Sequence, residues 1–100
     1  MKLDLKFYNT PIAHRGLHNG AKGFLENSLE AVNRAIFFNY GVEIDVQISS
    51  DKKVVVFHDD TLDRLTNEIG LIREKTFDEL KNILLLGSES TIPLLSDLLN

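Results

Sequence analysis

Apolar and polar residues follow patterns that predict short strands separated by helices. From Val42 to Ile48 every second residue is apolar, which is the period of a β-strand with two different faces. Residues 54–57 form an apolar, mostly β-branched run, typical of a strand buried on both faces. A turn at Asp51 and its two lysines joins these strands, and a further short strand is expected over residues 12–14, just before Gly16.

Capping signals predict a helix between the first two strands. Asn27 is expected to cap this helix, with Glu30 as its reciprocal partner three residues on, and Gly41 is expected to end it. The helix would bury a stripe of apolar residues at helical spacing: Leu29, Val32 and Ile36.

Two more helices are predicted in the second half of the chain. Thr76 and Glu79 form another capping box, and Gly87 is expected to close the helix that it begins. The apolar residues of that helix are Phe77, Leu80, Ile83 and Leu84. Pro93 introduces a third helix, whose apolar pattern stops at the last residue and comprises Leu94, Leu95, Leu98 and Leu99.

Strands that alternate with capped helices indicate a parallel α/β architecture. The 100 residues, 43% hydrophobic and 26% charged, suffice for one small domain. Three strands and an interrupted third helix cannot cover both faces of a parallel sheet. Residues 1–100 are therefore expected to form a single partial domain, the front part of a larger structure.

Charge and composition exclude several classes of function. Fifteen acidic and eleven basic residues give a net charge of −4 without a basic cluster, which disfavours nucleic-acid binding. The longest apolar runs are too short to span a membrane, and no signal-peptide core is seen, so a cytoplasmic location is expected. The absence of cysteine excludes thiol catalysis and thiolate metal sites. An uncovered sheet edge could drive self-association.

Two carboxylates lie at alternate positions of one predicted strand. Glu43 and Asp45 would share a face, about 6.6 Å apart along the backbone. Enclosed together they would repel each other, and a divalent cation such as Mg²⁺ or Ca²⁺ would relieve that repulsion. The alternative is a strand with one wet face, on which both carboxylates are simply solvated.

Two histidines stand at the ends of predicted strands. His14 is followed by Arg15, and His58 follows the strand at residues 54–57. The carboxyl ends of parallel strands hold the active site in α/β folds, so both imidazoles could serve proton transfer there and Arg15 could bind a phosphate. Alternatively, each histidine is an ordinary loop or core residue. His18 and Lys22 lie in the glycine-containing stretch that follows Arg15. His18 does not end a predicted strand and is given no role, and Lys22 is interpreted as a solvated side chain.

The segments that hold these residues form a recognisable series of motifs. They are Ile12-Ala13-His14-Arg15-Gly16, Glu26-Asn27-Ser28-Leu29, Val42-Glu43-Ile44-Asp45-Val46-Gln47 and Val55-Val56-Phe57-His58-Asp59-Asp60-Thr61-Leu62-Asp63-Arg64, followed by Ile92-Pro93-Leu94-Leu95. In order and spacing they resemble the glycerophosphodiester phosphodiesterase family. The resemblance implies a TIM-type (β/α)8 barrel of roughly 250 residues, of which this chain would be the N-terminal portion. It also implies small-molecule substrates, glycerophosphodiesters, hydrolysed to glycerol 3-phosphate and an alcohol.

The resemblance also assigns roles by position. His14 and His58 would be the acid/base pair, with His14 as base and His58 as acid in the first step. Arg15 would contact the phosphate, and Glu43 and Asp45 would bind Mg²⁺ or Ca²⁺ together with a third carboxylate from a strand beyond Asn100. Glu26 is expected to lie near the metal, although Leu25 replaces the proline that usually precedes it in the family.

Two other functions stay open at this point. One is a lipid phosphodiesterase of the sphingomyelinase D type, whose barrel resembles this one and uses a similar histidine pair. The other is a non-catalytic fragment of the barrel that keeps its first units and binds a partner or nothing.

Overall fold

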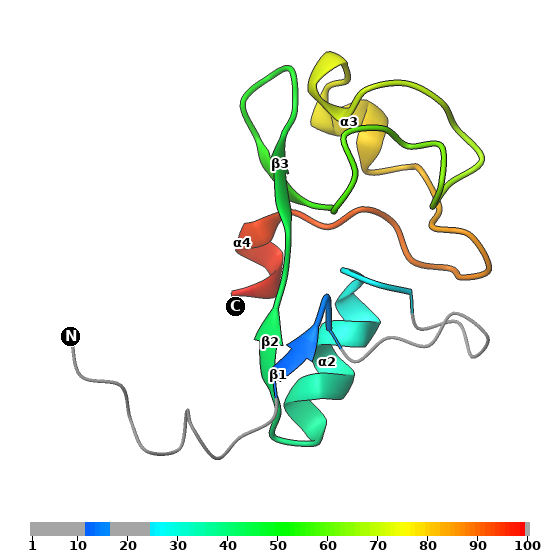
Figure 1. Cartoon of the computed structure of the whole chain (residues 1–100). Coiled ribbons are helices and arrows are strands. Elements are labelled where there is room, and N and C mark those ends of the chain that lie inside the picture. The colour runs from blue at the N-terminus through cyan, green and yellow to red at the C-terminus, as the bar shows by residue number, and fades with distance from the viewer. Residues whose placement is uncertain (1–11, 17–24, 100) are drawn as a thin grey trace.

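The computed structural model describes residues 12–16 and 25–99 (Figure 1). His18, Lys22 and the loop predicted around them lie outside this part of the chain. The elements are, in order, β1 (Ile12–His14), α2 (Leu29–Phe37), β2 (Gly41–Glu43), β3 (Val46–Ile48), β4 (Val54–Val56), a 3₁₀ turn η2 (Ile72–Glu74), α3 (Phe77–Leu80) and α4 (Leu95–Leu98).

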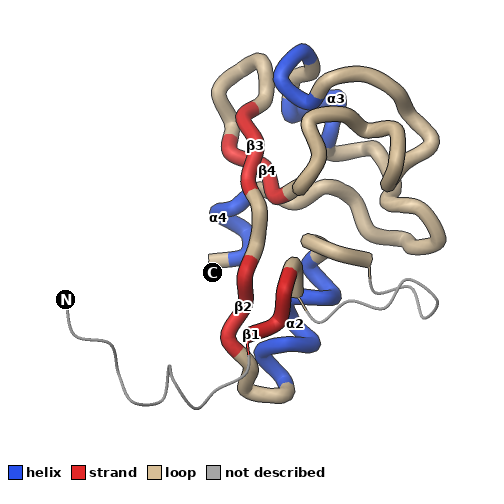
Figure 2. Tube along the Cα trace, viewed as in Figure 1, coloured by secondary structure: helices blue, strands red, loops and turns tan. Residues whose placement is uncertain are grey.

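The strands form two separate pairs rather than one parallel sheet. β1 pairs with β2 in parallel, and β3 pairs with β4 in antiparallel. Figure 2 shows β2 and β3 following one another along the same line, with β1 and α2 beside the lower one and β4 beside the upper one. The strand predicted over residues 42–48 is therefore two strands with different partners. The expectation that residues 54–57 belong to a parallel sheet is wrong, because a hairpin at the predicted Asp51 turn reverses the chain.

The break between β2 and β3 has a local cause at Asp45. Its backbone N–H donates to the Asn27 side-chain oxygen (3.1 Å), and its carbonyl accepts from the Phe57 N–H (2.9 Å). Both backbone groups of Asp45 are satisfied by partners outside the β1–β2 pair. The chain can consequently leave the β1–β2 pair and enter the β3–β4 pair without leaving a backbone polar group of Asp45 unpaired.

Helix α2 packs on the β1–β2 pair through its small residues. Ala31, Val32 and Ala35 are its buried residues, whereas Leu29 and Ile36 are exposed, so the predicted apolar stripe was right only for Val32. The approach is close, because an ideal Cβ built on Gly16 would lie 2.9 Å from the Cβ of Ala31. Larger side chains do not fit between surfaces this near each other, so they lie outside the contact.

The ends of α2 also differ from the prediction. Ser28, not Asn27, is the N-cap, since its hydroxyl accepts from the Ala31 N–H at 3.1 Å. At the other end Asn39 adopts the left-handed conformation, with φ of 59°, that the sequence suggested for Gly41. Gly41 instead begins β2.

The main hydrophobic core is formed by β4 and the segments that follow it. Its buried members are Val55, Phe57, Leu62, Leu65, Ile72, Leu80, Leu85 and Ile92. Val55 and the neighbouring Val56 are both buried, which confirms that β4 is covered on both faces. On its free edge β4 meets the segment before α4, where the Val56 N–H donates to the Pro93 carbonyl at 2.9 Å.

The last two helices are shorter than the apolar patterns suggest. The capping box of Thr76 and Glu79 is present, but α3 ends at Leu80. Residues Leu84 and Leu85 then form isolated bridges with Thr91 and Thr66, so the chain is extended there and not helical. The helix predicted after Pro93 is confirmed as α4, and no helix in residues 12–16 and 25–99 has the length and apolar character to cross a membrane.

Candidate functional site

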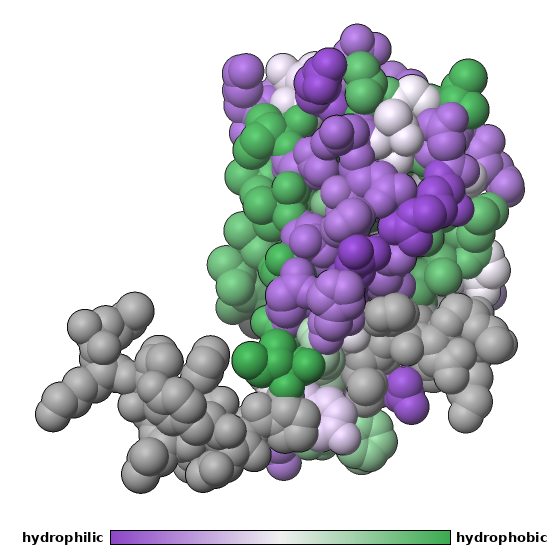
Figure 3. Space-filling model, in the orientation of Figure 1, coloured by the Kyte–Doolittle hydropathy of each residue, from purple (hydrophilic) through white to green (hydrophobic). Residues whose placement is uncertain are grey.

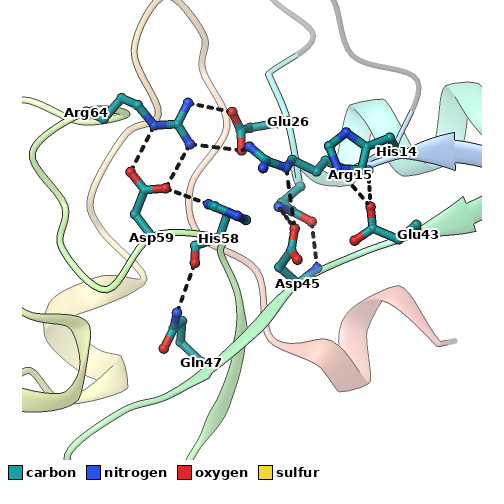
Figure 4. A network of polar contacts seen from close by, with 10 residues as sticks. His14, Arg15, Glu26, Glu43, Asp45, Gln47, His58, Asp59 and Arg64 are labelled. Carbon is teal, nitrogen blue, oxygen red and sulfur yellow. Dashed lines mark hydrogen bonds and ion pairs between the residues drawn. The ribbon is translucent and has the colours of Figure 1, made fainter.

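Parallel pairing of β1 and β2 brings the first three predicted site residues together. In the strand register His14 lies opposite Glu43, and His14 Nε2 is 3.3 Å from Glu43 Oε2. The same carboxylate oxygen accepts from the backbone N–H of Arg15 at 3.3 Å. Figure 4 shows this group at the ends of both strands, and the His14 side chain is 69% exposed, which leaves its ring accessible to a ligand.

A left-handed turn directs the chain after β1. Arg15 has φ of 58° and Gly16 has φ of 83°, and the Gly16 N–H donates back to the Ala13 carbonyl at 3.2 Å. The Arg15 carbonyl then accepts from the Asn27 N–H at 2.7 Å. This turn places the Arg15 guanidinium between Glu26 and Asp45.

Asp45 is held by a residue whose role the sequence did not reveal. The side-chain amide of Asn27 donates to Asp45 Oδ2 (3.2 Å) while its oxygen accepts from the Asp45 backbone N–H (3.1 Å). Asn27 is buried and has φ of 55°, a conformation that asparagine tolerates better than most residues. The sequence predicted Asn27 as the helix cap, whereas in the structure Ser28 caps the helix and Asn27 orients the Asp45 carboxylate.

Glu26 is a buried charge with two arginine partners. Its side chain is 8% exposed, and its oxygens accept from Arg15 Nη1 (2.7 Å), Arg64 Nη1 (2.7 Å) and Arg64 Nη2 (3.1 Å). Burial raises the pKa of Glu26, but the hydrogen bonds from Arg64 and Arg15 outweigh this and hold it below the usual range. Glu26 is therefore ionised at neutral pH.

His58 reaches the site from the end of β4. Because β3 continues β2 and β4 runs back along β3, the chain after β4 returns to the junction at Asp45. His58 therefore approaches the junction at Asp45 through a reversal of the chain and not, as predicted, from the common rim of a parallel sheet. The Gln47 side chain donates to the His58 carbonyl at 3.0 Å, and the His58 side chain is 41% exposed.

A carboxylate fixes the orientation of the His58 ring. His58 Nδ1 lies 2.7 Å from Asp59 Oδ1. Hydrogen bonds from Arg64, and then from His58, hold the pKa of Asp59 far below its usual range, so Asp59 is ionised and can only accept. Nδ1 must therefore carry the proton, which leaves His58 Nε2 as the nitrogen that can face a ligand. Nothing in the hydrophobic pattern distinguishes Asp59 or Arg64 from solvated loop residues, so no role was predicted for either.

The charges of this cluster are unbalanced. Among the residues labelled in Figure 4, the carboxylates of Glu26, Glu43, Asp45 and Asp59 face two guanidinium groups, which leaves two negative charges when both imidazoles are neutral. Within the described residues no three or more acidic or histidine side chains are arranged to hold a metal ion together. Glu43 and Asp45, both partly exposed, can supply two of the oxygen ligands that Mg²⁺ or Ca²⁺ needs.

Taken together, the fold and the site define an α/β protein with a polar, histidine-containing site where parallel strands end. The family model of the "Glycerophosphoryl diester phosphodiesterase family" matches residues 14–100, and the chain belongs to this family. A glycerophosphodiester phosphodiesterase of Caldanaerobacter subterraneus subsp. tengcongensis is 41% identical over 73 residues, which cover 72% of this chain and 29% of the relative.

Solved structures of relatives agree with the fold. A glycerophosphodiester phosphodiesterase from Agrobacterium tumefaciens superposes with a TM-score of 0.79 at 28% identity, covering 90% of this chain and 41% of that one. An Oleispira antarctica phosphodiesterase in complex with the product sn-glycerol-3-phosphate gives a TM-score of 0.77 at 34% identity, covering 92% and 40%. These structures are TIM barrels, and this chain corresponds to the N-terminal part of that fold, which confirms the predicted fold class. The chain spans less than half the length of the relatives it matches.

Proposed function

We propose that this protein hydrolyses glycerophosphodiesters to glycerol 3-phosphate and an alcohol. Membership of the family supports the reaction, and the product complex of the Oleispira relative supports the substrate class. The observation that carries the proposal is the convergence of His14, Arg15 and Glu43 at the ends of two paired strands. A phosphodiester placed there would meet a guanidinium and an accessible imidazole at once.

The acid/base roles are assigned to His14 and His58. In the first step a glycerol hydroxyl attacks phosphorus and His14 takes its proton. His58 acts in this step as the imidazolium, protonated on both ring nitrogens, and gives the Nε2 proton to the departing alcohol oxygen. Water then opens the resulting cyclic phosphate, with the two proton transfers reversed. Arg15 holds the phosphate oxygens, because its charged, forked side chain matches their geometry.

Glu43 and Asp45 are proposed as ligands of Mg²⁺ or Ca²⁺. Both offer the hard oxygen donors that these ions prefer, and the cluster's two surplus negative charges would otherwise repel an anionic substrate. When bound, a divalent cation neutralises phosphate oxygens. Asn27, which donates to Asp45, would keep that carboxylate turned toward the ion.

Release of glycerol 3-phosphate from glycerophosphocholine tests the proposal, on the protein at the full length that its gene encodes. Activity should require Mg²⁺ or Ca²⁺ and disappear with a chelator. His14→Ala and His58→Ala should each lower kcat by about 10²- to 10⁴-fold. Arg73→Ala, a change at an exposed position of η2, is the control and should leave kcat unchanged.

Glu43→Gln separates metal binding from proton transfer. The variant should raise the metal concentration needed for half-maximal activity, because a neutral amide is a weaker ligand than a carboxylate. An unchanged metal requirement would favour the solvated carboxylates that the sequence also allowed. Wild-type turnover in either histidine variant would remove that histidine from the mechanism.

The two other functions predict different outcomes. The comparisons do not favour a lipid phosphodiesterase of the sphingomyelinase D type, and preferential cleavage of lysophospholipid in the same assay would be needed to restore it. A non-catalytic fragment would hydrolyse neither substrate, and its melting temperature would not respond to millimolar cation. The cytoplasmic location and the self-association remain predictions.

A further inference from the structure

A continuous chain of charged contacts connects His58 to Arg15. His58 contacts Asp59 (2.7 Å), Asp59 accepts from Arg64 (2.9 Å), and Arg64 donates to Glu26 (2.7 Å), which also accepts from Arg15 (2.7 Å). Figure 4 shows Arg64 at the far end of the cluster from His14, with the two carboxylates between it and the residues proposed to meet substrate.

All three guanidinium nitrogens of Arg64 donate hydrogen bonds to carboxylates. Nε and Nη2 donate to the two oxygens of Asp59, each at 2.9 Å. Nη1 and Nη2 donate to the two oxygens of Glu26, at 2.7 and 3.1 Å. A planar fork that binds two carboxylates at once fixes their relative orientation, which a point charge such as lysine does not.

The two carboxylates belong to segments that are distant in sequence. Glu26 precedes α2 and packs under the turn after β1, whereas Asp59 follows β4. Arg64 thus joins the part of the site that holds Arg15 to the part that holds His58. Another link between these parts runs through the backbone, where the Phe57 N–H donates to the Asp45 carbonyl.

We infer that Arg64 is a positioning residue, which orients the His58 ring through Asp59 and the Arg15 guanidinium through Glu26. The inference deepens the proposed function and rests on it for its kinetic consequence. Both oxygens of Glu26 accept hydrogen bonds from these arginines, so Glu26 is the shared anchor of Arg15 and Arg64.

The charge of Arg64 and the burial of Glu26 agree with this role. The hydrogen bonds that Arg64 donates to Asp59, and then to Glu26, raise the pKa of Arg64, so its charge is permanent. Removing that charge would leave Asp59 beside His58 without its main partner and would leave the buried Glu26 with Arg15 alone. Both carboxylates would then be free to reorient, and the groups that they hold would move with them.

Arg64→Lys tests the inference, because it keeps the positive charge and loses the fork. The variant should lower kcat by about 10- to 100-fold, the effect expected from misplacing a catalytic group by about an ångström, with KM nearly unchanged. Arg73→Lys is the matched control and should alter neither. A large rise in KM at constant kcat would overturn the inference, since it would mean that Arg64 binds substrate directly.

Asp59→Asn tests whether Arg64 acts through Asp59. If it does, the double variant Arg64→Lys, Asp59→Asn should lose little more kcat than the more impaired single variant. Fully additive losses would contradict the inference. Circular dichroism and melting temperature establish that each variant is folded, and a lower melting temperature with wild-type kcat would show that Arg64 has only a structural role.

Nitrogen NMR of the His58 ring gives a measurement that does not depend on catalysis. At a pH where the ring is neutral, the wild-type spectrum should show Nδ1 as the protonated nitrogen, and Arg64→Lys should give a mixture of tautomers. An unchanged tautomer in the variant would refute the positioning of His58. If the wild-type protein fails to hydrolyse phosphodiesters but the tautomer shifts as expected, the proposed function fails while the positioning stands.

Discussion

Gly16→Ala should destabilise the fold through two separate effects at one position. Gly16 has φ of 83°, in the left-handed region that costs a residue with a Cβ about 1–2 kcal/mol. The added Cβ would also lie 2.9 Å from the Cβ and 3.0 Å from the carbonyl carbon of Ala31, well inside the roughly 3.5–4.0 Å at which carbon atoms pack.

The clash cannot be relieved by rotation of a flexible side chain. Ala31 is fully buried in α2, so either the helix or the Arg15–Gly16 turn must shift, and overpacking of this kind typically costs about 1–3 kcal/mol. The conformational and steric contributions together predict a loss of about 2–5 kcal/mol in the free energy of unfolding.

Gly87→Ala is a matched control for the conformational part. Gly87 has φ of 71°, but a Cβ there would meet no atom within 4 Å. It should lose only about 1–2 kcal/mol, and the reduced freedom of the unfolded chain affects both variants alike. Urea unfolding followed by circular dichroism, compared at equal m-values, measures both losses. If Gly16→Ala proves no more destabilising than Gly87→Ala, the close packing of α2 on the turn after β1 is refuted.

Three further predictions follow from local contacts. Asn27→Asp should lower the free energy of unfolding by about 1–3 kcal/mol, because it places a carboxylate oxygen where an amide now donates to Asp45, and an unchanged urea midpoint would contradict that contact. The two arginines hold the pKa of Glu26 below its ordinary 4.5 despite burial, so its ionised form stabilises the fold above that pH and this contribution is lost as the pH falls below it. Glu26→Gln should therefore weaken the dependence of stability on pH in this acidic range, and an identical acid-unfolding curve would refute it. Thr76→Ala should cost about 1 kcal/mol through loss of the capping box, measured by urea unfolding, and no change would show that the cap is unimportant to α3.

Predictions from the sequence were most reliable where the interacting residues lie close together along the chain. The Thr76 cap, the Asp51 turn and the buried strand β4 were all predicted, because each depends on residues within a few positions of one another. The prediction failed at Asn27 and Ser28, two adjacent residues that can both cap a helix. It failed again after α3, where bridges from Leu84 to Thr91 and from Leu85 to Thr66 outweigh a helical pattern of leucines.

The sequence by itself determined which chemical groups are available and near which strand ends they occur. His14, Arg15, Glu43 and Asp45 were identified from their positions beside predicted strands, and the structure brings them together. Their meeting required only that two neighbouring strands pair in parallel, which is a short-range consequence of the strand–helix–strand order.

Only the tertiary structure decided how the second half of the site joins the first. The hairpin that reverses β4 brings His58 back to the β2–β3 junction, and the fork of Arg64 reaches Glu26, 38 positions earlier in the chain. Hydrophobic periodicity reports whether a side chain is buried, but it does not report which charged side chains face each other. Those pairs are set by the packing of segments that are distant in sequence. The roles of Asn27, Asp59 and Arg64 could therefore be assigned only from the tertiary structure.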